Sequence, residues 1–320
     1  MRLKIFAAVS ALSLSAAALA QQATEPAFTA DAFRAHVAFL SDDLLEGRNA
    51  GERGYDLAAR YVATRFAALG LTPAAEGSWY QQVPFQESSL AEQPATLSIG
   101  GQAFANGGDV LIGPSAFDAS QDIQGEVVFV GFGLDEPTRG FDDYAGLDVK
   151  GKIVAMLSGF PKGTPSELGA HLASEKARMA EERGAIGVIS IPTRTSLKAV
   201  SWEKRKDYAG EPSLTWVGKD GKPYDEAPGI RFGASLNTPA AEALFAGAKA
   251  PLSAVLDQAD KEGGKPKGFA LKQPVTFQRT STKRMLESPN VVAVLPGSDP
   301  ALAGEYVLLM AHLDHDGPKA

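Results

Sequence analysis

Apolar residues recur at helical spacing in the first part of the chain. A first helix is predicted by apolar residues separated by four, three and four positions: Phe33, Val37, Leu40 and Leu44. Thr29 can cap this helix, and Gly47 is expected to end it. After the loop 51–54, a second helix is predicted by the stripe Tyr55, Val62, Phe66 and Leu69. Gly70 and Pro73 are typical of its end.

From about Ala91 the pattern changes to short β-rich runs that glycine and proline interrupt. These runs are Ala95–Ile99, Glu126–Phe132 and Lys152–Leu157. A helical stretch from about Glu167 to Arg183 then precedes a strand at Ala185–Ile191. Strand, helix and strand in this order predict a βαβ unit, in which a right-handed crossover joins parallel strands. Residues 196–230 and 258–268 are rich in Lys, Gly, Asp and Pro and are predicted to be loops.

The last part of the chain combines strand-like runs with the candidate chemistry. A short helix is expected at Thr238–Gly247, and strands at Gln273–Ser281 and Asn290–Leu295. Tyr306–Ala311 is apolar throughout, which predicts a strand buried on both faces. The sequence His312-Leu313-Asp314-His315-Asp316 follows it directly. Because ligands of open α/β sheets bind beyond the carboxyl ends of strands, this segment is the candidate site.

Composition limits the chemistry that this segment can carry. The 320 residues include no cysteine, which excludes a thiol nucleophile, a disulfide framework and an iron–sulfur cluster. The formal net charge of −7 offers no basic surplus for nucleic acid. A metal would therefore need histidines and carboxylates, and the chain has four histidines. His36 and His171 lie on predicted helices and receive no function.

The first twenty residues are predicted to be a secretory signal. Arg2 and Lys4 precede the apolar run Ile5–Ala20, which ends in an A-x-A cleavage pattern before Gln21. The run is too short and too rich in Ala and Ser for a spanning helix. The mature protein is therefore expected to be periplasmic or secreted, without a membrane span, and cleavage changes its net charge from −7 to −9.

His312 and Asp314 are the candidate site residues. A zinc-binding histidine uses one ring nitrogen for the metal and needs an acceptor, often a carboxylate, for the other. From spacing alone, a metal site and an ordinary polar loop at a strand end remain equal alternatives. No G-x-S-x-G elbow, H-E-x-x-H helix, P-loop or complete dinucleotide fingerprint occurs.

Several segments resemble the di-zinc aminopeptidases, a family related to glutamate carboxypeptidase and the transferrin receptor. Ser288–Gly297 and Glu305–His315 resemble the entry to the catalytic domain, and the opening helices through Leu44–Arg48 also match. Phe141–Val154 and Gly184–Ile189 resemble the protease-associated domain that is inserted in many of these enzymes.

The resemblance implies an α/β fold with a discontinuous zinc-exopeptidase domain that a β-rich protease-associated domain interrupts. Residues 1–20 would be the signal peptide, and residues 21–105 and 281–320 would belong to the peptidase domain. Residues 106–280 would form the insert, and the two ends of the insert should lie close together. His312 matches the first zinc ligand, and Asp314 matches the carboxylate that orients it.

By this resemblance the parent protein is an aminopeptidase that acts on peptides and carries two zinc ions. The family's remaining ligands and its general base lie downstream of the His-x-Asp pair, so we expect the chain to be cut short and inactive by itself. A non-catalytic receptor or binding protein on the same scaffold is the alternative. A related carboxypeptidase or glutaminyl cyclase also stays open.

Overall fold

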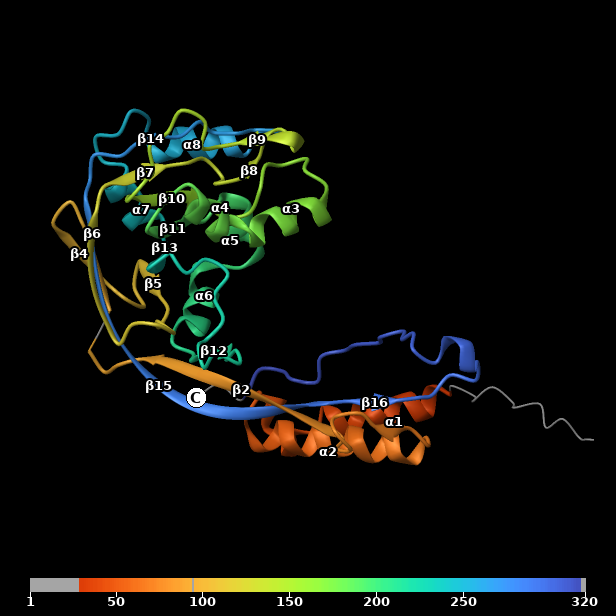
Figure 1. Cartoon of the computed structure of the whole chain (residues 1–320). Coiled ribbons are helices and arrows are strands. Elements are labelled where there is room, and N and C mark those ends of the chain that lie inside the picture. The colour runs from red at the N-terminus through yellow and green to blue at the C-terminus, as the bar shows by residue number, and fades with distance from the viewer. Residues whose placement is uncertain (1–28, 94, 318–320) are drawn as a thin grey trace, which may run out of the picture.

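The computed structural model describes residues 29–93 and 95–317, so the predicted signal at 1–20 lies outside the described residues. The chain is a mixed α/β protein, as predicted. Figure 1 shows an open C, in which a long curved strand joins an upper part rich in helices and strands to a smaller lower part. No helix among the described residues is long and apolar enough to cross a membrane.

A six-stranded sheet forms the centre of the upper part, in the order β14-β7-β10-β11-β13-β5. Its strands are β5 (Val110–Ile112), β7 (Val127–Phe129), β10 (Ile153–Leu157), β11 (Gly187–Ile191), β13 (Phe232–Leu236) and β14 (Phe269–Ala270). The four inner strands are parallel, whereas β5 and β14 are antiparallel edges. β10 pairs in register with β11 across a helical connection, which confirms the predicted βαβ unit.

Helices follow the inner strands of this sheet (Figure 1). They are α3 (Ser166–Ser174), α4 (Lys176–Glu182), α5 (Arg194–Ala199), α6 (Trp202–Ala209), α7 (Thr238–Leu244) and α8 (Leu252–Ala259). All five residues of β10 are buried because both faces of the strand are covered. Ile153 packs into the larger hydrophobic core, which includes Phe245, the C-cap residue of α7. Val154 packs into a smaller core, together with Ala180 of α4.

A second sheet connects the upper and lower parts. Its strands are β2 (Tyr80–Leu90), β3 (Thr96–Ile99), β4 (Gln102–Ala105), β6 (Ser120–Gly125), β12 (Ser213–Trp216) and β15 (Val275–Val291). β15 pairs with β3 and β6 over its first residues and with β2 from Ser281 to Val291. The two strands predicted at 273–281 and 290–295 are thus largely one strand. Thr96 of β3 pairs with both Ala105 of β4 and Gln278 of β15.

Short elements complete the described chain. They are β1 (Thr72–Pro73) paired with β16 (Ala293–Val294), β8 (Asp135–Glu136) paired with β9 (Phe141–Asp142), and the 3-10 helices η1 (Asp43–Arg48), η2 (Pro137–Arg139) and η3 (Pro300–Leu302).

The lower part contains α1 (Ala30–Leu40) and α2 (Arg53–Ala68). Thr29 caps α1 as predicted, because its hydroxyl accepts a hydrogen bond of 3.1 Å from the Ala32 amide. The helix ends at Leu40 and not at Gly47, since Asp42 caps a separate turn by accepting from the Leu44 amide at 2.9 Å.

Two further predictions were wrong. Tyr306–Ala311 is not a buried strand but an exposed segment without strand pairing. A strand needs a neighbour for its backbone N–H and C=O groups, and no described residue pairs with this run. The supposed loop 196–230 contains α6, most of α5 and β12, and the Trp202 side chain is buried against the upper part.

Candidate functional site

The candidate site lies in the segment His312–Gly317, which follows the exposed apolar run and contacts the turn between α1 and α2. The His315 amide donates to the Arg48 carbonyl at 3.0 Å, and Arg48 Nε donates to the Leu313 carbonyl at 2.9 Å. Arg48 also donates to the Leu40 carbonyl at the end of α1. One arginine therefore joins α1, η1 and the candidate segment.

The turn that holds this segment has an uncommon backbone. Glu46, Gly47 and Arg48 have φ values of 50°, 88° and 84°. These values lie in the left-handed region, which residues other than glycine rarely adopt. A Cβ at Gly47 would collide with the Asp316 carbonyl oxygen, so glycine permits the close approach of the two segments. Such strain persists only where surrounding contacts stabilise it, and the Arg48 hydrogen bonds are contacts of this kind.

The structure brings His312 and Asp314 together, with a detail that spacing does not predict. His312 Nδ1 lies 2.9 Å from the backbone carbonyl oxygen of Asp314, whereas the Asp314 carboxylate is 3.7 Å away. A carbonyl can only accept, so this hydrogen bond places the proton on Nδ1. In a neutral ring, Nε2 then carries the lone pair that a metal would bind. Both side chains are exposed, at 79% for His312 and 56% for Asp314.

Asp314 also acts electrostatically on α2. Tyr55 is buried, and its hydroxyl donates to the Pro289 carbonyl at 2.7 Å. Burial raises the pKa of Tyr55, and the negative charge of Asp314 raises this pKa further. The neutral phenol therefore persists beside the candidate segment and ties α2 to β15.

The described residues do not fit a zinc site. Within 29–93 and 95–317, no group of three or more His, Cys, Asp or Glu side chains could hold a metal ion. His36 instead contacts the Tyr61 hydroxyl at 2.7 Å, and His171 lies on α3 in the upper part. A structural zinc site takes four ligands and a catalytic one takes three protein ligands, so His312 with its neighbours is insufficient.

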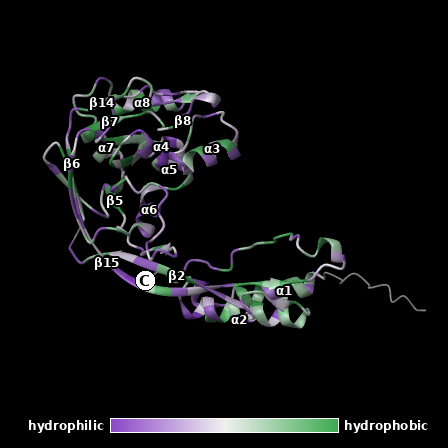
Figure 2. Cartoon of the chain, viewed as in Figure 1, coloured by the Kyte–Doolittle hydropathy of each residue, from purple (hydrophilic) through white to green (hydrophobic). Residues whose placement is uncertain are grey.

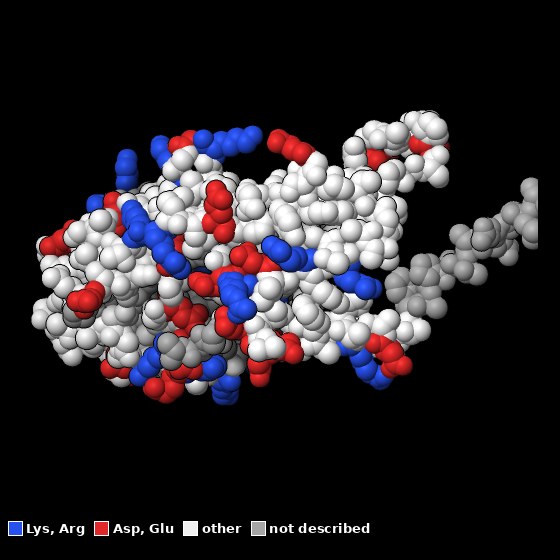
Figure 3. Space-filling view, turned by 90° about the horizontal axis from the view of Figure 1, so that it is seen from below, with Lys and Arg blue, Asp and Glu red and all other residues white. Residues whose placement is uncertain are grey.

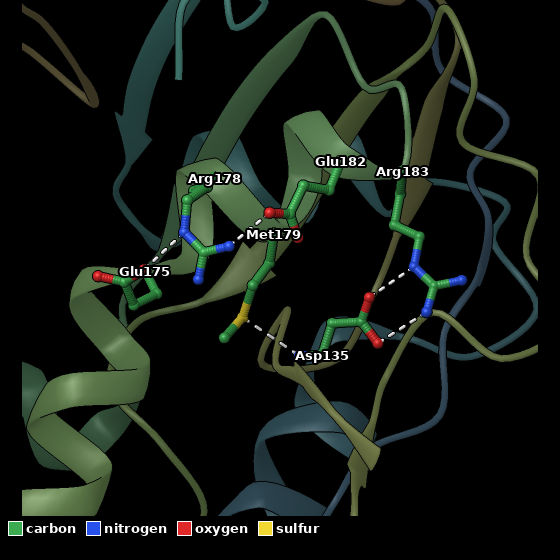
Figure 4. Close-up of polar contacts among 6 residues, drawn as sticks. All are labelled: Asp135, Glu175, Arg178, Met179, Glu182 and Arg183. Atoms are coloured by element: carbon green, nitrogen blue, oxygen red, sulfur yellow. Dashed lines mark hydrogen bonds and ion pairs between the residues drawn. The ribbon is translucent and has the colours of Figure 1, made fainter. Parts of the chain in front are cut away.

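A second gathering of charged side chains lies on α4 in the upper part (Figure 4). Arg183 forms a two-pronged contact with Asp135 of β8, in which the Nη2–Oδ1 distance is 2.8 Å. Arg178 bridges Glu175 and Glu182 on the same helix. Each of these carboxylates faces an arginine, so the cluster fastens α4 and β8 and does not resemble a metal site.

Arg48 is the site residue that reasoning about sequence chemistry missed. It lies in the segment Leu44–Arg48 that carries part of the family resemblance, but neither its charge nor its neighbours single it out. Its role depends on a contact across 265 positions of sequence, from its guanidinium to the Leu313 carbonyl.

Comparison with known proteins gives no family assignment. No protein-family profile matches the sequence, and no curated protein matches it. The zinc aminopeptidase BSAP from Bacillus subtilis has a TM-score of 0.33 and 16% identity, over 82% of this chain and 47% of its own. The subtilisin-like protease Apa1 from the Antarctic psychrotroph Pseudoalteromonas sp. AS-11 has a TM-score of 0.30 and 13% identity. This match covers 62% of this chain and 35% of the protease chain. This chain thus spans less than half the length of either.

Proposed function

We propose that this chain is part of an exported zinc-dependent aminopeptidase that acts on peptides. Residues 21–105 and 281–320 would belong to the peptidase domain, and residues 106–280 would form the protease-associated insert. The sequence resemblance of Ser288–Gly297 and Glu305–His315 to the catalytic domain of the di-zinc aminopeptidases supports this proposal.

The observation that carries the proposal is the state of the His312 ring. Its Nδ1 is held by the Asp314 carbonyl, which leaves Nε2 as the nitrogen that can bind a cation. Arg48 fixes the backbone on both sides of Asp314 through the Leu313 carbonyl and the His315 amide. Metal-binding histidines commonly donate their other ring nitrogen to a carbonyl or carboxylate in this way.

The proposed metal content sets a clear requirement. The described residues do not hold zinc by themselves, so two zinc ions would need further ligands from residues outside 29–93 and 95–317. We therefore expect the 320-residue chain to bind zinc weakly and to hydrolyse no aminoacyl substrate.

The test compares this chain with the longer enzyme that the proposal requires. Zinc content would be measured by inductively coupled plasma mass spectrometry, and turnover with leucine-p-nitroanilide. In that longer enzyme, His312→Ala should remove metal and activity. Asp314→Asn should lower activity by at most about 10–100-fold, because the Asp314 carbonyl survives the change.

His171→Ala is the matched control, since this histidine lies on α3, away from the candidate segment. If the longer protein contained no zinc, the result would favour the non-catalytic binding protein. Strong turnover by the 320-residue chain, or full activity of His312→Ala, would contradict the proposed site.

A further inference from the structure

A groove on the upper part carries a charge opposite to that of the whole protein. It has a volume of about 470 Å³ and forms where η2 and the loops around Gly163 and Gly263 meet. Its charged lining residues are Arg139, Lys162, Lys265 and Glu262. The lining therefore has a formal surplus of two positive charges, whereas the chain has a net charge of −7.

Apolar side chains contribute part of the remaining lining of the groove. Phe141 and Pro161 are buried beneath it, and Leu168 is half-buried. The Lys265 ammonium lies 4.3 Å from the centroid of the Phe141 ring and donates to the Gly140 carbonyl at 2.7 Å. A cation is thus fixed at the edge of an apolar surface.

The two loops that border the groove are connected, so its shape exists before any ligand arrives. The Gly263 amide donates to the Lys162 carbonyl at 2.8 Å, and the Thr164 hydroxyl donates to the Pro161 carbonyl at 2.7 Å. Gly163 has a φ of 84°, and a Cβ there would collide with the Glu262 carboxylate. Glycine therefore allows the acidic side chain to pack closely against the opposite loop.

We propose that this groove binds an acidic peptide segment. The carboxylates would meet Arg139, Lys162 and Lys265, and aliphatic carbons between them would lie on Pro165 and Leu168. Charge complementarity selects an anionic partner and excludes a cationic one. The apolar floor favours a peptide over a bare inorganic anion, which has no surface to place there. This proposal does not depend on the zinc site.

The test uses the full chain and two fluorescein-labelled peptides of alternating residues, Glu-Leu and Gln-Leu. Anisotropy should show binding of the Glu-Leu peptide at low salt and its loss in 1 M NaCl, where the screening length falls to about 3 Å. The double variant Arg139→Gln, Lys162→Gln should weaken binding about fivefold to tenfold, as expected for two exposed charge pairs.

Two further variants separate the site from general charge effects. Lys219→Gln with Lys222→Gln removes two exposed cations outside the groove and should leave affinity unchanged. Glu262→Gln should tighten Glu-Leu binding about threefold, because it removes the one carboxylate of the lining.

Three results would overturn the proposal. Equal affinity for the Gln-Leu peptide would exclude recognition of carboxylates. Equal weakening by the Lys219 and Lys222 changes would show that net charge alone attracts the peptide. Displacement of the peptide by inorganic phosphate at concentrations no higher than those of the peptide would identify a simple oxyanion site.

Discussion

The upper and lower parts of the molecule differ in how completely they bury their apolar side chains. Phe129 and Ile153 in the upper sheet are fully buried, whereas Phe33 on α1 is 69% exposed and Val307 is 93% exposed. α1 buries none of its residues, although Figure 2 shows it largely in hydrophobic colours. An apolar pattern therefore produces a closed core only where a second layer of structure covers it.

Charged side chains are unevenly spread over the face seen from below. Figure 3, which views the molecule from below, shows both signs of charge intermixed over much of this face. Toward the right of this view, residues other than Lys, Arg, Asp and Glu cover a broad area. Exposed hydrophobic side chains of the lower part include Phe33, Leu44 and Val307. The stability of the two parts should accordingly depend on different interactions.

The largest expected effect comes from truncating a side chain in the upper core. Phe129 is fully buried and packs against the rings of Phe245 and Phe269, with centroid distances of 5.3 and 5.4 Å. Phe129→Ala should lower the free energy of unfolding by about 3–5 kcal/mol in urea titrations. Leu308→Ala, in the exposed run of the lower part, should change it by no more than about 0.5 kcal/mol. Similar losses for both variants would contradict the division described above.

A buried charge in the upper part predicts a smaller, pH-dependent effect. Lys176 donates to the carbonyls of Leu157 and Gly159 at the end of β10, and burial lowers its pKa to about 8. An unfolded lysine titrates near 10.4. Between these values the unfolded state binds more protons, so the free energy of unfolding should rise with pH, by about 2 kcal/mol from pH 8 to pH 10.

Lys176→Met should remove this rise, because it deletes the titrating group. Urea titrations at pH 8, 9 and 10 would measure the difference between the variant and the original protein. Lys204→Met is the matched control, since Lys204 is exposed and pairs with Asp207 at 3.1 Å. The control should keep the rise, and a flat profile in the unmodified protein would show that Lys176 carries no such penalty.

Local patterns predicted much of the fold, and contacts distant in sequence account for most of the errors. Thr29 caps α1, and Gly70 adopts the left-handed φ of 78° after α2, because both depend on a few adjacent residues. β15 was predicted as two strands because its middle is polar and exposed, yet these residues pair with β2. The apolar run 306–311 has strand-like residues but no neighbouring strand among the described residues.

The candidate site shows the same limit. The His312-x-Asp314 spacing did not predict that the backbone carbonyl of Asp314, 2.9 Å from Nδ1, would contact the ring, and the roles proposed for the two side chains stay predictions. Backbone geometry of this kind depends on how Arg48 holds the segment, and no short sequence pattern encodes that contact. The groove at Arg139 and Lys265 likewise joins residues that are 126 positions apart.

The smallest expected effect concerns how firmly the lower part holds the candidate segment. Arg48→Ala removes the hydrogen bonds to the Leu313 and Leu40 carbonyls, although the Arg48 carbonyl can still accept from the His315 amide. Two lost hydrogen bonds at a half-exposed site should favour opening by about 1–2 kcal/mol. Amide exchange at His315, followed by mass spectrometry or NMR, should therefore accelerate about tenfold, while global stability changes little.

Arg53→Ala is the appropriate control for this measurement. Arg53 lies at the start of α2, and its contact with Glu46 is a long, exposed ion pair of 3.8 Å that contributes little. It should leave exchange at His315 unchanged. If Arg48→Ala also left it unchanged, the segment would be held by the close approach of Gly47 and Asp316 alone. In that case Gly47→Ala, which introduces a Cβ at that contact, should be the variant that releases His312 and Asp314.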